Sequence, residues 1–201
     1  MKFTAENISL VTNFLTMISI AFLVIQVSIL RKQYKGDHER SRRESVIKLQ
    51  ELWMEYHNMK TRYARQILPF MDEDSCRDFW LDNSFKITLK SRSVLCDLFN
   101  CKENDLKYKD DSIVIEGAHL YMLRDIITKY LNLLEIIFTA WRNNIGDRKM
   151  IEEEFGKNIS LNNSEFILEK IVNASAFLPS IKAYTRYLKE TTKYKTKKKI
   201  Q

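Results

Sequence analysis

The chain has 201 residues, a formal net charge of +7 and only four glycines and two prolines. This length suits one membrane anchor plus one domain of ordinary size and excludes two large domains. The scarcity of turn-forming residues argues against hairpins and glycine-rich phosphate loops and favours long helices. We therefore expect an all-α protein, in which a single N-terminal transmembrane helix is followed by a cytoplasmic bundle of four or five helices.

The N-terminal segment predicts a membrane anchor, because no charged residue occurs from Asn7 to Leu30. A helix of this length reaches roughly 36 Å, enough to cross a hydrocarbon core of about 30 Å. A buried core helix of a soluble protein is the alternative, but basic residues begin abruptly at Arg31, as at a lipid interface. A cleaved signal peptide fits poorly, since Lys2 is offset by Glu6 and no small-x-small cleavage site follows.

Basic residues cluster directly after the apolar span, whereas only Lys2 precedes it. The positive-inside rule then places the short N-terminus outside and the C-terminal bulk in the cytoplasm. Three cysteines without a disulfide pattern suit the same reducing compartment. The expected segments are an extracytoplasmic N-terminus (1–6), a transmembrane helix (7–30), a cytoplasmic helical domain (31–181) and a basic helix end and tail (182–201). The basic residues after the span are Arg31, Lys32, Lys35, Arg40, Arg42 and Arg43.

Polar side chains recur at heptad spacing within the span. A lone helix in lipid gains nothing from such a stripe, so the pattern favours packing between subunits or the lining of a narrow water-filled pore. Alternatively, the hydroxyl groups bond back to their own helix at little cost. We expect self-association through this face and leave conduction as a narrower hypothesis. The expected pore or subunit interface comprises Ser9, Thr12, Asn13, Thr16, Ser19, Leu23 and Gln26.

Apolar residues at helical spacing predict further helices in the cytoplasmic domain. Gly36 and Asp37 should break the juxtamembrane run, Pro69 should stop the next helix, and the charged stretch 102–111 reads as a loop. Pro179 should kink the last helix. The expected helices cover residues 37–68, 72–100, 112–143, 147–158 and 164–195, which form an antiparallel bundle.

No catalytic or metal-binding constellation emerges from the sequence. Glu116 and His119 have the spacing of one di-iron ligand pair, but no second Glu-x-x-His occurs. Cys96 and Cys101 lack the matching second pair of a structural zinc site. We therefore expect no enzyme activity, no catalytic residue, no metal and no cofactor.

The C-terminal tail from Lys182 to Gln201 is strongly basic and contains a single acid, Glu190. A local excess of this kind points to a polyanionic partner, although a solvated, frayed end is the simpler alternative. Anionic lipid would contribute about 1 kcal/mol per basic residue, and nucleic acid or an oligonucleotide could stack on the interleaved tyrosines. Together with the basic residues after the span, the expected anionic-ligand or lipid contacts are Lys182, Tyr184, Arg186, Tyr187, Lys189 and Lys193.

Two weak motifs, Asn132-x-x-Glu135 in a long helix and Pro179 seven residues before Arg186, complete the pattern. With the single uncharged helix and the basic segment after it, the chain resembles an uncharacterised family of small bacterial single-pass membrane proteins. It is also similar in architecture to membrane effectors of bacterial anti-phage systems, such as the channel subunit HalB of the Hailong system.

The resemblance implies an oligomeric channel or membrane-disrupting pore in the bacterial inner membrane, with a tetramer as the first expectation. It further implies a nucleotide or oligonucleotide ligand at the cytoplasmic domain, made by a partner nucleotidyltransferase. The alternative function is a non-conducting, membrane-tethered adaptor that recruits a protein or anionic lipid through its helical domain and basic tail.

Overall fold

The computed structural model describes the backbone of residues 5–56, 59–159 and 168–200, and the side chains of residues 14–56, 61–159 and 168–191. Within these ranges the chain forms eight α-helices and one small three-stranded sheet, which confirms the all-α class. The chain divides into two compact units, Met1–Arg43 and Glu44–Gln201.

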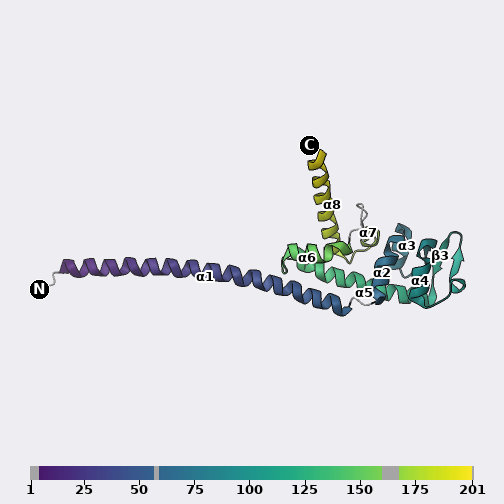
Figure 1. Ribbon diagram of the computed structural model, residues 1–201, viewed down its shortest axis with the longest axis horizontal. Coiled ribbons are helices and arrows are strands. Elements are labelled where there is room, and N and C mark those ends of the chain that lie inside the picture. Colours follow the sequence, from purple (N-terminus) through teal and green to yellow (C-terminus); the bar gives the residue numbers. More distant parts are fainter. Residues whose placement is uncertain (1–4, 57–58, 160–167, 201) are drawn as a thin grey trace. The chain divides into compact units, whose positions relative to one another are not determined.

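The first helix, α1 (Ala5–Tyr56), is continuous and contributes residues to both units (Figure 1). The expected break at Gly36 and Asp37 does not occur. An interior glycine costs a helix only about 1 kcal/mol, and lysine, arginine and glutamate on either side are good helix formers. Asp37 can act as a cap only where the backbone leaves the helix, and here it stays helical.

The expected stop at Pro69 is confirmed. Helix α2 (Met59–Ile67) passes into a 3-10 turn, Leu68–Phe70, that contains this proline. A proline lacks an amide hydrogen and clashes with the preceding turn, so the α-helical ladder cannot continue through it.

The single helix expected over residues 72–100 is wrong. The structure has α3 (Glu73–Trp80), a strand β1 (Phe85–Thr88) and α4 (Arg92–Phe99) in its place. Side chains of β1 alternate between buried and exposed, starting with buried Phe85, which is the period of a strand and not of a helix. The run is only four residues long, so its apolar members also fitted a helical stripe.

The loop expected over residues 102–111 and the helix start expected at Ser112 are also corrected. Strands β2 (Lys107–Lys109) and β3 (Ser112–Ile115) form a hairpin around Asp110, which has a φ of 55°. The sheet has the antiparallel order β1-β3-β2. Gly117, with a φ of +56°, then allows the chain to turn from β3 into the next helix.

Helix α5 (Gly117–Arg142) is the centre of the second unit and packs against α2, α6 and α8. Figure 1 shows α6 and α8 near one end of α5 and the sheet near the other. The C-terminal part of α1 joins this core, where the Trp53 ring lies 6.2 Å from that of Tyr130. The buried α5 residues are Leu120, Leu123, Ile126, Ile127, Tyr130, Leu131, Leu133, Leu134, Ile137, Phe138, Ala140 and Trp141.

Asp147 caps the next helix as expected: its carboxylate accepts hydrogen bonds from the first amides of α6 (Arg148–Phe155). The expected helix start at Ser164 lies outside the described residues. After the short α7 (Glu169–Asn173), Pro179 begins α8 (Pro179–Ile200) and does not kink a longer helix. This is the first-turn position where a proline costs no hydrogen bond.

Candidate functional site in the membrane anchor and the helical domain

The apolar part of α1 is long and hydrophobic enough to span a membrane. Its best window has a mean hydropathy of 2.0, and none of that window is buried by the rest of the chain. The large apolar side chains from Phe14 to Leu30 are 39–71% exposed. In water such a contiguous apolar surface is strongly unfavourable, whereas in lipid it is not. The rest of the described chain therefore does not cover this segment, whereas the core helix of a soluble protein would be buried.

The expected polar face of α1 is exposed at Thr16, Ser19, Leu23 and Gln26. The Ser19 hydroxyl donates a hydrogen bond to its own helix, to the carbonyl of Leu15 at 2.9 Å. A hydrogen bond within the same helix removes much of the free-energy cost of placing a hydroxyl group in lipid. The Gln26 amide has no hydrogen-bond partner among the described residues, so in lipid it needs a partner from another molecule. Ser9, Thr12 and Asn13 belong to α1, but their side chains lie outside the described ones.

Basic side chains follow the apolar span on the same helix. A shallow hollow of about 600 Å³ runs along one side of α1 where the two regions meet, with apolar residues at one end and basic residues at the other. Its lining residues are Val27, Leu30, Arg31, Tyr34, Lys35 and His38. Of the expected basic contacts, Arg31, Lys32, Lys35, Arg40 and Arg43 are exposed and Arg42 is half-buried.

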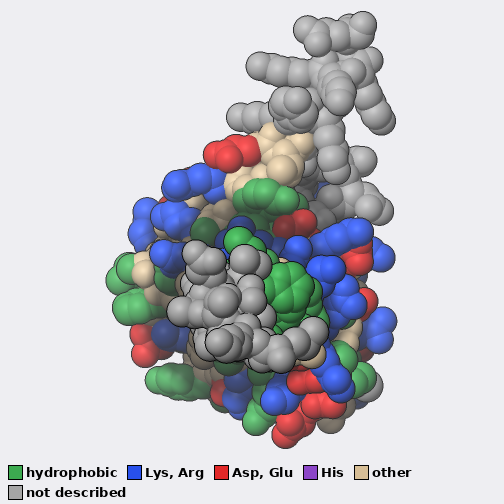
Figure 2. All heavy atoms as spheres, turned by 90° about the vertical axis from the view of Figure 1, so that its left-hand side faces the viewer, with side chains coloured by type: hydrophobic (Ala, Val, Ile, Leu, Met, Phe, Trp, Pro, Cys, Tyr) green, Lys and Arg blue, Asp and Glu red, His purple; other side chains and the backbone are tan. Residues whose placement is uncertain are grey.

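The basic residues expected at the start of the tail differ in their surroundings. Lys182 and Arg186 are exposed one helical turn apart on α8, whereas Lys189 forms an ion pair with Glu169 of α7. The side chain of Lys193 lies outside the described ones. Figure 2 shows lysine and arginine side chains in several separate groups over one face of the molecule, with acidic side chains between them.

Tyr184 is a core residue and does not face a ligand, contrary to expectation. It is 1% exposed, its ring stacks on Phe138 at 4.2 Å, and Trp141 packs edge-on at 5.0 Å. Burial raises its pKa above the ordinary value for tyrosine. The sequence places Tyr184 between basic residues, but the apolar face of α8 turns it towards α5.

Tyr187 is half-buried in a polar cluster that the sequence did not reveal. Its hydroxyl donates to the Glu152 carboxylate at 3.4 Å, and the indole nitrogen of Trp141 donates to the same carboxylate at 2.9 Å. Partial burial and the nearby negative charge raise the pKa of Tyr187. The guanidinium of Arg148 covers the Trp141 ring at 5.1 Å. Glu152 thus holds α6 to α5 and α8.

A second polar contact between distant segments joins α5 to α8. The Glu135 carboxylate accepts hydrogen bonds from the backbone amides of Ser180 and Ile181, at 2.8 and 3.0 Å. The Thr139 and Ser180 hydroxyls lie 2.9 Å apart beside it. The first amides of a helix have no hydrogen-bond acceptor within the helix, and here a carboxylate from another helix is their acceptor.

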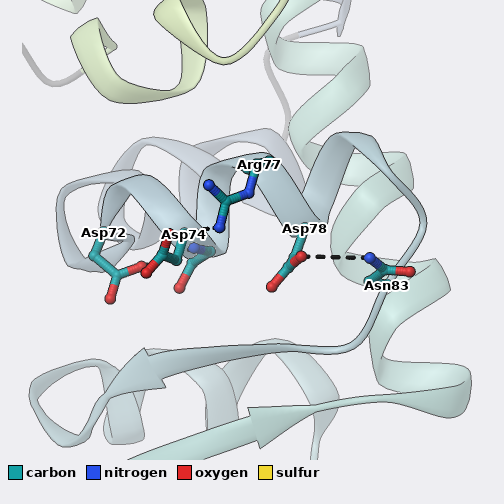
Figure 3. A network of polar contacts seen from close by, with 6 residues as sticks. Asp72, Asp74, Arg77, Asp78 and Asn83 are labelled. Carbon is teal, nitrogen blue, oxygen red and sulfur yellow. Dashed lines mark hydrogen bonds and ion pairs between the residues drawn. The ribbon is translucent and has the colours of Figure 1, made fainter.

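A polar hollow of about 640 Å³ lies between α3 and the sheet. Figure 3 shows Asp72, Asp74 and Asp78 along α3, with Arg77 paired to Asp74 at 2.7 Å and Asn83 donating to Asp78 at 3.4 Å. Two of the three lysines that line the hollow also have partners, in the pairs Lys86–Asp110 and Lys107–Glu116. The hollow therefore has charges of both signs, most of them paired, and no concentrated field for one kind of ion.

The described residues contain no group of three or more histidine, cysteine, aspartate or glutamate side chains arranged to hold a metal ion. Glu116 of the Glu-x-x-His pair forms the ion pair with Lys107, and the His119 ring stacks on Phe99 at 4.1 Å.

Comparison of the chain with models of known protein families, with curated protein sequences and with solved structures gives no significant match.

Proposed function

We propose that this chain is a single-pass membrane effector that assembles into a homo-oligomer through α1 and responds to an anionic ligand at its helical domain. The observation that carries the proposal is the apolar stretch of α1, whose described side chains from Phe14 to Leu30 are all exposed and which continues into the basic segment that follows it. The positive-inside rule then orients the chain with the helical domain in the cytoplasm of a bacterial cell.

Assembly is the proposed role of the polar face of α1. The Gln26 amide offers both donors and an acceptor, so the same residue in a neighbouring copy is a suitable partner. Interhelical hydrogen bonds in membranes stabilise association by about 0.6–2 kcal/mol each. Ser19, whose hydroxyl is already bonded to the Leu15 carbonyl, has a small side chain and so allows two helices to approach closely at that face.

Ion conduction is the proposed output of assembly, since a ring of copies would bring this polar face around one axis. The resemblance described above implies that such effectors serve anti-phage defence, with a nucleotide or oligonucleotide signal from a partner nucleotidyltransferase. On the helical domain, Lys182 and Arg186 are the exposed basic residues among the described side chains of α8, and they are free to meet a phosphate group.

The test uses full-length protein purified in detergent and reconstituted in liposomes. We expect a mass that is a multiple of the 24.0 kDa chain, with four copies as the first expectation, together with ion flux. Gln26→Leu should lower the oligomeric state while the protein still inserts. Ser28→Ala is the matched control, because the Ser28 hydroxyl bonds its own helix at Val24.

A separate double variant tests ion conduction. Replacing Thr16 and Ser19 together by leucine should abolish flux without preventing insertion. Unchanged flux in that double variant contradicts a pore through this face, and a wild-type protein that stays monomeric contradicts assembly altogether.

A non-conducting, membrane-tethered adaptor is the second candidate, and a hollow in the helical domain favours it. About 590 Å³ in volume, it lies between the end of α1, α2 and α5. Tyr56 and Ile136 on its walls are 55% and 52% exposed, an apolar surface of the kind that binds a protein segment. Under this function Ile136→Asp should abolish partner capture, and liposomes containing the wild-type protein should show no flux.

A further inference from the structure

Two cysteines meet at the C-terminal end of α4. Asn100 ends the helix in the left-handed conformation, with φ 50° and ψ 47°. The backbone amide of Cys101 then donates to the carbonyl of Cys96 at 3.1 Å. The Asn100 amide donates to the same carbonyl. A helix end with a left-handed residue and a six-to-one hydrogen bond is of the Schellman type, in which the side chains at the two bonded positions frequently contact one another.

The backbone geometry suits a bond between these two side chains. A hydrogen bond of this length between the amide of one residue and the carbonyl of the other keeps the two Cα atoms within about 7 Å. Disulfides join residues whose Cα atoms are about 4.4–6.8 Å apart. The Cα separation therefore does not prevent a bond between the two sulfur atoms, which side-chain rotation can bring together without unfolding α4.

Solvent and small oxidants can reach the pair. Cys96 and Cys101 are both half-buried and line an open hollow of about 560 Å³. Its other lining residues are Tyr63, Asp97, Asn100, Lys102 and Asp105. Cys76 is different: it is 1% exposed in the core, and burial raises its thiol pKa to about 12. The chain thus contains one accessible pair and one protected thiol.

We propose that Cys96 and Cys101 form an oxidant-sensitive dithiol, which peroxides convert to an intramolecular disulfide. The thiolate of one cysteine attacks an oxygen of hydrogen peroxide, the O–O bond breaks, and the departing hydroxide takes a proton and leaves as water. The resulting sulfenic acid is attacked by the second sulfur, the S–O bond breaks, and a second water leaves. Two thiols are oxidised and one peroxide is reduced to two waters, and a dithiol reductant reverses the change.

The rate should depend on pH. Burial and the neighbouring Cys101 raise the pKa of the Cys96 thiol, so a small fraction is ionised at neutral pH. Disulfide formation should accelerate as pH rises, because the thiolate is the attacking species. The site is independent of ion conduction and of the nature of any ligand.

The experiment treats reduced, full-length protein in detergent with hydrogen peroxide, blocks the remaining thiols with N-ethylmaleimide and analyses tryptic peptides by mass spectrometry. Both cysteines lie within residues 93–102, a single peptide without an internal lysine or arginine. We expect this peptide to become lighter by two hydrogen atoms and to lose both alkylation sites, and dithiothreitol to restore them. Cys76 should remain reduced.

Cys96→Ser and Cys101→Ser should each abolish the intramolecular disulfide, whereas Cys76→Ser should leave it unchanged. Far-ultraviolet circular dichroism checks that the variants are folded. Oxidation of either thiol to a sulfinic acid without the internal bond would overturn the proposal. So would disulfides that only join two chains, or a Cys76 that oxidises as fast as the pair.

Discussion

The Glu135 carboxylate on α5 binds the first turn of α8, through the backbone amides of Ser180 at 2.8 Å and Ile181 at 3.0 Å. This contact gives a structural role to the two weak sequence motifs. The glutamate of Asn132-x-x-Glu135 and the helix start at Pro179 are two sides of one tertiary helix cap. Negative charge is favourable at this end of a helix because the amide dipoles point towards it.

Removing that cap should destabilise the helical domain. Glu135→Ala leaves two amides of α8 without their acceptor, and we expect a loss of about 2–3 kcal/mol in the free energy of unfolding. Glu135→Gln should cost less, since an amide oxygen still accepts one bond. Chemical denaturation of the full-length protein in mild detergent, followed by circular dichroism, measures the difference.

Glu153→Gln is the matched control, because Glu153 is exposed and lies 3.8 Å from its helical neighbour Lys149. It should change stability by less than about 0.5 kcal/mol. Equal effects at the two glutamates would mean that the contact between α5 and α8 is not the stabilising one.

Tyr184 should behave as a core residue. Tyr184→Ala removes a buried ring that contacts Phe138 and Trp141, so we expect a loss of about 3–5 kcal/mol. Tyr184→Phe keeps the ring and should stay within about 1 kcal/mol of wild type. Thermal unfolding of both variants checks this. A stable, folded alanine variant would place Tyr184 at the surface instead.

Asp72 should make stability depend on pH in the acid range. Its carboxylate caps α3 by accepting from the Ser75 amide at 2.7 Å, and hydrogen bonding by Ser75 lowers its pKa below the ordinary 3.8. A lowered folded-state pKa means that the ionised group stabilises the fold above pH 3.8. That contribution is lost as the pH falls through the folded-state value.

The Asp72 variants separate capping from charge. Asp72→Ala should cost about 1 kcal/mol at neutral pH, whereas Asp72→Asn should retain most of the cap. Because asparagine does not titrate, stability relative to wild type should shift in favour of Asp72→Asn below pH 3.8. Unfolding midpoints measured from neutral to acid pH test the sign, and a shift in the opposite direction contradicts it.

Exposed basic residues on α8 should contribute to binding of anionic surfaces. Charge reversal in the double variant Lys182→Glu, Arg186→Glu should weaken binding to vesicles that contain anionic lipid, and raised salt should weaken wild-type binding in the same direction. Lys189→Gln is the comparison, since Lys189 is already paired with Glu169. Co-sedimentation with vesicles measures the effect, and an unchanged double variant would exclude this surface of α8.

The sequence predicted features that depend on long periodic patterns or on strong local signals. The apolar span of α1, the stop at Pro69 and the cap at Asp147 are of this kind. The small sheet was missed because Phe85 and Ile87 belong to a strand of four residues, too short to separate period two from a helical stripe.

Contacts between distant segments could not be predicted from one sequence. Nothing local distinguishes Glu135, which caps α8, from Asp125, an exposed acid on the same helix. Tyr184 looked like a surface residue because its chain neighbours are charged, and only the packing of α8 on α5 buries it. The contact between Cys96 and Cys101 depends on the left-handed conformation of Asn100. Asparagine adopts this conformation readily, but the residue type alone does not predict it.

Cross-linking in native membranes tests the central claim, self-association through the polar face of α1, most directly. Gln26→Cys should form a disulfide-linked dimer of the chain when the membranes are oxidised. Val24→Cys, on the other side of the helix at the same depth, should remain monomeric. Efficient cross-linking at 26 with little at 24 is the predicted result. No cross-link at 26, or equal cross-linking at both positions, would contradict assembly through this face.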